Sequence, residues 1–393
     1  MAGLWRAHAV RGRVVAVTGS VGKTTAKELI AAMLRTQSRT HMSLGSVNSS
    51  EWLARAMLGI RPKHRFAVLE VSAGGYPGQM REVAPFVRPD VAVIVALART
   101  HTTVFTSLDG AAEEKAYLLD SLSPGGVAVL NGDDSRVAAL ATRARAKGHR
   151  VVSFGTTPGL DFRGLDATAR WPERLSFTLE HEGRQMAVVT QLVGTHWLPS
   201  VLAALATAVT CGVRVEEAIE AVRYVAPSPS RLQPVQLPGG AVMLRDDFNG
   251  SVDTLERALD VLRTARVDRR VLMITDFTDF RANFHHRYRH LARLVPGTAD
   301  HVVFIGEHAG YAERRLLEVG FPAAAITIAE DLREAAHFAT EHLREGDLAL
   351  IRGQMIHHVS RIFLDQVGEV RCWKSTCTLR KTCDRCPNLT SPS

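Results

Sequence analysis

The sequence has no apolar run that approaches the roughly 18 to 20 residues needed for a membrane-spanning helix. Residues 1–13, MAGLWRAHAVRGR, are basic and lack the apolar stretch of a secretory signal peptide. These absences exclude a helical membrane protein and lead us to expect a cytoplasmic one. Disulfide bonds are uncommon in that compartment.

Lysine is scarce, because seven of the 48 basic residues are lysines and the rest are arginines. The net charge is +8, but the basic residues are scattered along the chain and form no single tract. Basic residues interleaved with aromatics, as single-stranded nucleic-acid sites require, are absent. Nucleic-acid binding is therefore disfavoured, and a lysine inside a motif is informative.

A chain of 393 residues exceeds the usual size of one core, so we expect two domains. Short Val/Ala/Ile runs alternate with helical patterns before and after the turn-rich stretch VAPSPSRLQP, which is typical of buried parallel sheets. A small antiparallel hairpin is expected over 175–194, followed by an apolar helix over 199–211. The sequence thus predicts an α/β protein: a P-loop parallel-sheet ATPase domain (1–228), a Rossmann-like α/β domain (229–370) and a Cys-rich tail (371–393).

The segment VTGSVGKTTAKE places a glycine-rich turn and a lysine between a strand and a helix. Backbone N–H groups and a helix N-terminus then face one point and bind phosphate, with Lys23 on the terminal phosphates and the Thr24 hydroxyl on Mg²⁺. The full P-loop pattern has glycine where this chain has Val17, so the loop is a shortened variant. The residues predicted to bind the nucleotide here are Thr18, Gly19, Ser20, Val21, Gly22, Lys23, Thr24 and Thr25.

Two further side chains follow neighbouring strands. Glu70 ends the apolar strand FAVLE, and His101 comes just after VAVIVALART. Both lie where the carboxyl edge of a parallel sheet is expected, and Mg²⁺ prefers oxygen ligands. Taken alone, such a glutamate is more often a solvated strand end, and a lone loop histidine is usually a surface residue.

Several motifs occur in the order and spacing found in the Mur ligases. They include VTGSVGKTTAKELIAAML, FAVLEVSAGGYPGQM, GAAEEKAYLLDSLSPGGVAVLNGDD, SRLQPVQLPGGAVMLRDDFNGSVDTLERALDVL and GDLALIRGQ. The chain resembles the central and C-terminal domains of that family over about residues 13–365. The resemblance implies an ATP-dependent ligase that converts a carboxylate to an acyl phosphate and then to an amide, with release of ADP and phosphate.

The resemblance also implies roles for individual residues. Lys23 would act on the transferred phosphoryl group, and Thr24 with Glu70 would hold one Mg²⁺. His101 and a carbamylated Lys115 would hold a second Mg²⁺, because a carbamate supplies an anionic oxygen. The alternative for Lys115 is a surface lysine on an amphipathic helix.

In the second domain, Arg231, Asp246 and Asn249 match family residues that lie near the nucleotide. The resemblance implies that two domains close on ATP and exclude water from the acyl phosphate.

The chain also departs from the family. The P-loop strand begins about residue 13, where the family has a preceding domain that binds the UDP sugar. At four further positions this chain has a residue that differs from the family's: Ala96, Phe248, Ser251 and Asp279. Asp276, in contrast, is the residue that the family has. We therefore expect an acid other than a UDP sugar, small or carrier-bound, and an amine or amino acid. The alternative is a peptidoglycan-precursor ligase whose UDP-sugar domain is supplied by another chain.

Four of the five cysteines lie in the tail: Cys372, Cys377, Cys383 and Cys386. Four thiolates ending in C-x-x-C can close a tetrahedral zinc site, and an iron–sulfur cluster or redox-active thiols are the alternatives. The basic residues around them predict that the tail docks a protein partner or presents the acid. Cys211 is expected in the core.

Two other interpretations, a histidine metal site and a nucleotide switch, are disfavoured. His286 and His290 are one helical turn apart and could share a metal, but a solvated basic face is favoured. A nucleotide-dependent switch could also use the P-loop. It would not need Glu70, His101 and Lys115 together, so a ligase is favoured.

Overall fold

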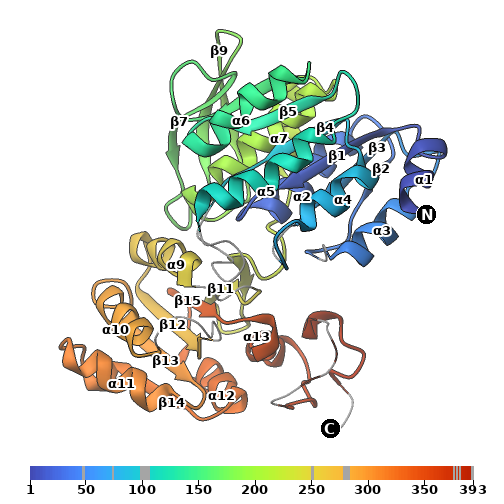
Figure 1. Ribbon diagram of the computed structural model, residues 1–393. Coiled ribbons are helices and arrows are strands. Elements are labelled where there is room, and N and C mark those ends of the chain that lie inside the picture. Colours follow the sequence, from blue (N-terminus) through green and yellow to red (C-terminus); the bar gives the residue numbers. More distant parts are fainter. Residues whose placement is uncertain are drawn as a thin grey trace. The chain divides into compact units, whose positions relative to one another are not determined.

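The computed structural model describes the chain except residues 47–48, 73–74, 98–106, 249–251, 278–283, 375–376, 378, 380–381 and 391–393. The chain divides into two compact units, each built around its own sheet (Figure 1). The first consists of Met1–Thr168, Leu175–Gln191 and Thr195–Ala226. The second consists of Ala169–Arg174, Leu192–Gly194 and Pro227–Ser393.

The first unit contains a nine-stranded sheet in the order β2-β3-β1-β4-β5-β6-β7-β8-β9. Strands β1 to β7 pair in parallel, and β8 and β9 form an antiparallel hairpin at one edge, as predicted. The strands are β1 (Arg13–Thr18), β2 (Thr40–Met42), β3 (Phe66–Glu70), β4 (Val91–Ile94), β5 (Val127–Asn131), β6 (Arg150–Gly155), β7 (Phe162–Thr168), β8 (Ser176–His181) and β9 (Arg184–Val189).

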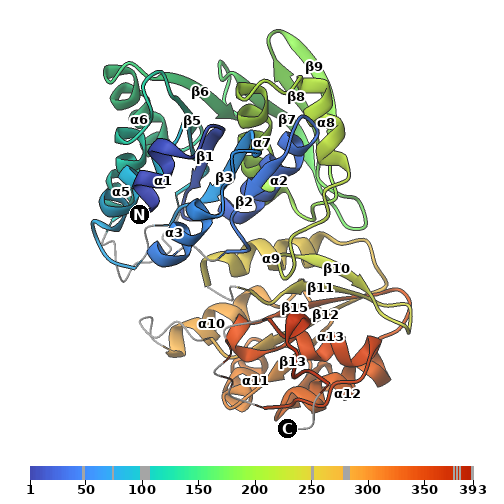
Figure 2. The ribbon, with the colours of Figure 1, turned by 90° about the vertical axis from the view of Figure 1, so that its right-hand side faces the viewer.

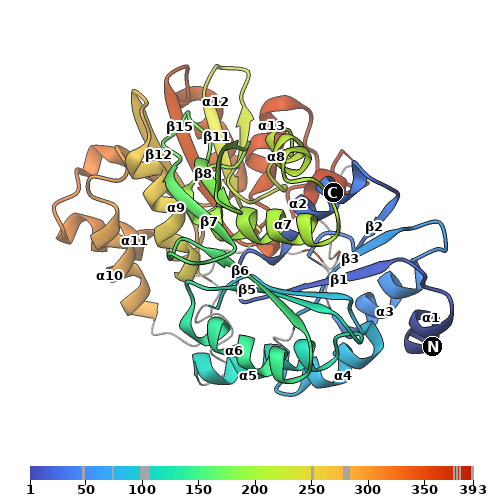
Figure 3. The same ribbon diagram turned by 90° about the horizontal axis from the view of Figure 1, so that it is seen from above.

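Helices cover both faces of this sheet (Figure 3). One layer contains α1 (Ala2–His8), α3 (Ser50–Leu58), α4 (Gln79–Val87), α5 (Leu108–Asp120) and α6 (Ser135–Ala146). The other contains α2 (Lys23–Arg35), α7 (Leu198–Thr210), which follows the 3₁₀ turn η1 (Thr195–Trp197), and α8 (Val215–Arg223). Because both faces are covered, every residue of β3 and β4 is buried, which explains their unbroken apolar runs.

Helix α1 was not predicted, because its seven residues show too little periodicity to indicate a helix. Tertiary contacts stabilise it: the Trp5 indole N–H donates to the Ile60 carbonyl at 3.0 Å. The Arg6 guanidinium lies 2.9 Å from Asp90. None of the described helices is long and apolar enough to span a membrane.

The second unit contains a six-stranded sheet in the order β10-β11-β15-β12-β13-β14 (Figure 2). Only the edge strand β10 is antiparallel to its neighbour, so the Rossmann-like prediction is confirmed. The strands are β10 (Gln233–Gln236), β11 (Val242–Asp246), β12 (Arg269–Thr275), β13 (His301–Ile305), β14 (Ile326–Ala329) and β15 (Asp347–Arg352).

Two apolar clusters pack on opposite faces of this sheet. One face is covered by α9 (Val252–Thr264), α10 (Phe284–Leu294) and α11 (Ala309–Glu318). The other is covered by α12 (Leu332–His342) and α13 (Ser360–Val367). Three short 3₁₀ turns complete the unit: η2 (Ala323–Ala325), η3 (Met355–His357) and η4 (Cys383–Arg385), the last in the tail.

Candidate active site

The P-loop connects the end of β1 to the start of α2 at the carboxyl edge of the first sheet. Gly22 precedes α2 with φ of +79°, and a Cβ atom there would lie 2.5 Å from the Ser200 hydroxyl oxygen. Gly19 has φ of +149°, and its Cβ would lie 3.0 Å from the Ala96 carbonyl oxygen. Both positions require glycine, so the loop backbone packs closely on its neighbours. Val17 lies inside β1, paired with Glu70, which explains the shortened loop pattern.

The loop has the chemistry of an anion site. The first turn of α2 contains no acidic residue, so the partial positive charge of the helix N-terminus is not neutralised there. The ammonium of Lys23 lies over the loop and donates to the carbonyls of Gly19 at 2.9 Å and Ser20 at 3.1 Å. The residues present therefore fit a bound nucleotide phosphate.

Thr24 and Glu70 lie together behind the loop. Both side chains are buried, with 6% and 2% of their surface exposed. The Thr24 hydroxyl donates to Glu70 Oε2 at 2.8 Å and lies 2.9 Å from the Ser46 hydroxyl. A hydroxyl and a carboxylate side by side at the end of a phosphate loop are oxygen donors of the kind that Mg²⁺ binds. Thr18 and Thr25 are also buried.

Lys27, which was not predicted as a site residue, is fully buried one turn after Lys23. Its ammonium donates to the carbonyls of Ser43, at 3.0 Å, and Gly45, and it lies 3.9 Å from Glu70 Oε2. Lys27 and Glu70 thus form a buried pair of opposite charge, in which each group compensates the charge of the other. The signal was present in the sequence, because lysine is rare in this chain and Lys27 lies on the P-loop helix.

Lys115 is buried on α5, with 3% of its surface exposed. Burial, together with the positive charge of Lys23, lowers the pKa of Lys115 from 10.5 to about 8. The alternative of a surface lysine is therefore excluded. A lysine with this pKa carries a substantial fraction of free amine near neutral pH, which is the form that reacts with CO₂.

Glu114, next to Lys115, fixes the start of α4. Its carboxylate accepts hydrogen bonds from the backbone N–H groups of Gly78 at 2.9 Å and Met80 at 2.7 Å. These contacts join α5 to α4, and they were not predicted because they depend on residues more than 30 positions apart.

Two predicted site residues, His101 and Asn249, lie outside the described residues.

In the second unit, Asp246 at the end of β11 is bonded to the Arg352 guanidinium at the end of β15. Arg352 is fully buried and also donates to the Thr254 hydroxyl at 2.6 Å. The Arg231 guanidinium lies 4.6 Å from the centre of the Phe248 ring, a cation–π contact. Arg231 and Asp246 therefore belong to one polar cluster at the carboxyl edge of the second sheet.

The tail is attached to the second unit by a buried ion pair. Arg245, 2% exposed, donates to both carboxylate oxygens of Asp384 at 2.7 and 3.1 Å. Its guanidinium also lies 3.9 Å from the centre of the Phe363 ring. Burial raises the pKa of Asp247, the second carboxylate bonded to Arg245.

The four tail cysteines do not form the predicted zinc site. Among the described residues, which include all four, no three His, Cys, Asp or Glu side chains lie close enough to hold an ion. Cys383 is buried, and its Sγ lies 3.5 Å from His358 Nδ1. Cys377, in contrast, is exposed. The turn that contains Cys383, η4, packs against α13, and its Asp384 binds Arg245. This packing explains why the four thiols are not brought together around one point. Cys211 is buried, as expected.

The predicted solvated face of α10 agrees with the contacts of His290, which lies 3.0 Å from Glu256. The rings of His286 and His290 are parallel, with their centres 6.5 Å apart. Asp276 accepts a hydrogen bond from the Tyr288 hydroxyl at 2.8 Å and lies 3.2 Å from His308.

Two family models match most of the chain. The Mur ligase middle domain matches residues 17–208, and the domain described as "Mur ligase, glutamate ligase domain" matches residues 230–355. The chain is 29% identical over 339 residues to UDP-N-acetylmuramoyl-tripeptide–D-alanyl-D-alanine ligase of Escherichia coli, covering 85% of this chain and 70% of the relative. The Bacillus subtilis ligase of the same name is 24% identical, with 90% and 76% covered.

Solved structures agree on the fold. A crystal structure of MurF from Acinetobacter baumannii superposes with a TM-score of 0.84 at 23% identity, covering 94% of this chain and 79% of that one. MurF ligase from Thermotoga maritima in complex with ADP gives a TM-score of 0.77 at 20% identity, with 93% and 82% covered.

Proposed function

We propose a reaction for this chain, which belongs to the Mur ligase family: it activates a carboxylate with ATP and joins the product to an amine. The chain is an ATP-dependent ligase that forms carbon–nitrogen bonds. The observation that best supports the proposed site is the buried contact between Thr24 and Glu70 directly behind the P-loop lysine.

The proposed reaction has two steps. In the first, an oxygen of the substrate carboxylate attacks the γ-phosphorus of ATP, an acyl phosphate forms and ADP leaves. In the second, the nitrogen of the amine attacks the acyl carbon, the amide forms, and phosphate leaves with the former carboxylate oxygen. Bound Mg²⁺ neutralises charge on the phosphates.

Different residues of this chain are proposed to bind the phosphates and the two Mg²⁺ ions. The backbone N–H groups at the start of α2 and the Lys23 ammonium bind the phosphates and stabilise the charge that develops during transfer. Thr24 and Glu70 would hold one Mg²⁺, and the Lys27 ammonium lies 3.9 Å from Glu70 Oε2. His101 and carbamylated Lys115 would hold the second.

Lys115 has the environment that a carbamate requires. It is buried, its pKa is lowered, and it lies within electrostatic range of Lys23. A carbamate at Lys115 would replace a repulsive contact with Lys23 by an attractive one. In the second unit, Arg231, Asp246 and Asn249 are proposed to bind the nucleotide.

Two alternative pairs of acid and amine are candidate substrates. Sequence departures from the family favour an acid that is not a UDP sugar, small or carrier-bound. The names of the relatives favour a UDP-N-acetylmuramoyl-tripeptide joined to D-alanyl-D-alanine. The second candidate is therefore a peptidoglycan-precursor ligase.

One assay separates these candidates. The purified protein receives Mg-ATP with either UDP-N-acetylmuramoyl-tripeptide and D-alanyl-D-alanine, or fractions of a small-molecule extract of its source freed of UDP sugars. Phosphate release accompanied by a product equal in mass to two components minus water identifies the substrates. Lys23→Ala should abolish both signals, and the exposed Lys147→Ala should retain them. Product that forms equally with Lys23→Ala would reject the proposed site.

The basic tail is proposed to dock a protein partner or to present the acid. Deletion of residues 371–393 should then change turnover or oligomeric state. Unchanged turnover and unchanged oligomeric state would reject this role.

A further inference from the structure

The amino edge of the first sheet, opposite the P-loop, is lined with basic residues. Arg13 begins β1, Arg65 directly precedes β3 and Arg150 begins β6. Parallel strands start at the same edge of a sheet, so these side chains lie at one end of the unit. Each of them is exposed.

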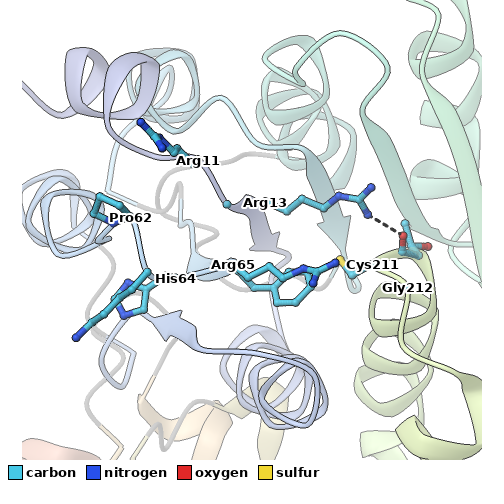
Figure 4. A pocket seen from close by; sticks show the side chains of 11 residues that line it. Arg11, Arg13, Pro62, His64, Arg65, Cys211 and Gly212 are labelled. Carbon is cyan, nitrogen blue, oxygen red and sulfur yellow. Dashed lines mark hydrogen bonds between the residues drawn. The ribbon is translucent and has the colours of Figure 1, made fainter.

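Two adjoining cavities lie at this edge. The larger, of about 690 Å³, lies between residues 11–13, residues 62–66 and the end of α7 (Figure 4). The second, of about 500 Å³, shares Arg11, Gly12, Arg13 and Thr210 with the first and extends to Arg150. We call the two together the amino-edge cleft. Each cavity is of the size that small ligands occupy.

Gly12 sets the width of the amino-edge cleft. A Cβ atom at this position would lie 2.3 Å from the His64 carbonyl oxygen and 2.6 Å from that of Arg65, so only glycine fits. The Arg13 N–H donates to the Arg65 carbonyl at 2.9 Å. In Figure 4, the side chains of Arg13 and Arg65 extend in the same direction, toward Cys211 and Gly212 at the end of α7.

The positive charge of the cleft is poorly neutralised. Its one lining carboxylate, Asp90, accepts hydrogen bonds from Arg6 at 2.9 Å and from the Val14 N–H at 2.7 Å. In the part of the chain that the structure describes, no carboxylate forms an ion pair with the remaining basic lining residues. These residues are Arg11, Arg13, Lys63, Arg65 and Arg150.

A helix terminus explains only part of this charge. The C-terminus of α7 carries about half a negative charge, and the Arg13 guanidinium donates to the Thr210 carbonyl there at 3.3 Å. That contact offsets the positive charge of about one of the five basic residues, Arg13. Five cations along the amino-edge cleft that form no ion pair with a described carboxylate repel each other, so the arrangement is most stable with an anion bound.

We propose that the amino-edge cleft binds a small anion with two or more phosphate groups, such as a nucleoside diphosphate or inorganic polyphosphate. Guanidinium groups bind phosphate oxygens with two N–H donors, and the cations extend over both cavities, so one phosphate would not contact them all. The aromatic lining residue Phe66 is buried and unavailable for stacking on a base, which argues against a nucleic acid. This site is separate from the P-loop site and does not depend on the proposed reaction.

The test is calorimetric titration of inorganic triphosphate, with EDTA present, into the full-length Lys23→Ala protein, which lacks the P-loop lysine. The double variant Arg13→Gln/Arg65→Gln in this background should weaken binding by at least about tenfold, because two charge-assisted contacts are lost. The matched control Arg81→Gln/Arg136→Gln removes the same charge from the starts of α4 and α6 at the carboxyl edge. It should change the affinity less than about twofold.

Thermal unfolding of each variant checks that these surface substitutions leave the fold intact. Absence of saturable triphosphate binding would overturn the proposal, as would equal weakening by the control pair, which indicates attraction to net charge alone. Tighter binding of a random 20-nucleotide DNA with the same dependence on Arg13 and Arg65 would also overturn it, in favour of a nucleic-acid surface.

Discussion

The hydroxyl of Thr24 donates a hydrogen bond of 2.8 Å to Oε2 of Glu70, and this bond joins the first turn of α2 to the end of β3. Lys27, one turn further along α2, lies 3.9 Å from the same oxygen. The P-loop helix and its neighbouring strand are thus connected through a buried carboxyl group, the one proposed above to hold Mg²⁺.

Replacement Glu70→Gln keeps the shape of this side chain and removes its charge. We expect a higher Mg²⁺ concentration for half-maximal phosphate release, and a loss of about 1–3 kcal/mol in the free energy of unfolding because Lys27 loses its anionic partner. A magnesium titration and urea unfolding measure the two effects. Ser46→Ala, which removes another contact of Thr24 but no charge, is the control. An unchanged magnesium requirement in Glu70→Gln would contradict the assigned role.

The pKa of about 8 at Lys115 predicts a defined pH dependence for the proposed carbamate. Only the free amine reacts with CO₂, and the amine replaces the ammonium as pH rises through 8. In protein equilibrated with ¹³C-bicarbonate, a carbamate resonance should therefore grow between about pH 7 and 9. Lys115→Met should lose the resonance and Lys147→Met should retain it. A resonance that persists in Lys115→Met would assign the carbamate elsewhere.

The ion pair between Arg245 and Asp384 predicts that the tail stabilises the second unit. In Asp384→Asn, the buried guanidinium loses a charged partner, which should cost about 1–3 kcal/mol of unfolding free energy and speed tryptic cleavage after Lys374 and Arg385. The exposed pair of Arg371 and Glu369 supplies the control, because Glu369→Gln should cost less than about 0.5 kcal/mol. Equal protease sensitivity of wild type and Asp384→Asn would show that the tail is not held by this contact.

The unequal burial of the cysteines predicts unequal reactivity toward a thiol reagent. Exposed Cys377 should react first, and Cys211, whose pKa burial raises to about 12, should react only after unfolding. Mass spectrometry of the native protein after timed labelling gives the order. A zinc site would instead protect the four tail thiols equally and release them with a chelator, and that result would restore the zinc hypothesis.

Local patterns in the sequence were sufficient to predict the two α/β units and the P-loop. The runs before Lys23, Glu70 and Asp246 indicate buried strands, because a parallel sheet covered on both faces leaves no polar alternation. The order of the motifs then identified the family, which the domain matches confirm.

Contacts between residues that are distant in the sequence could not be predicted from it. The pairing of Arg245 with Asp384 spans 139 positions, and the scatter of basic residues gave no indication that Arg13 and Arg65 line one cavity. The burial of Lys115 could not be predicted either, because the sequence of α5 is only weakly amphipathic and does not indicate which face is buried. Spacing suggested a zinc site for the tail cysteines, but the packing of Asp384 on Arg245 decides where this turn lies.

The most direct measurement of the central claim uses a substrate acid that supports phosphate release, labelled with ¹⁸O in its carboxylate. If the reaction passes through an acyl phosphate, one ¹⁸O atom per turnover appears in the released phosphate, and Lys23→Ala produces none. If all the label remains in the amide and the residual acid while phosphate is still released, the carboxylate was not phosphorylated, and the proposed mechanism is wrong.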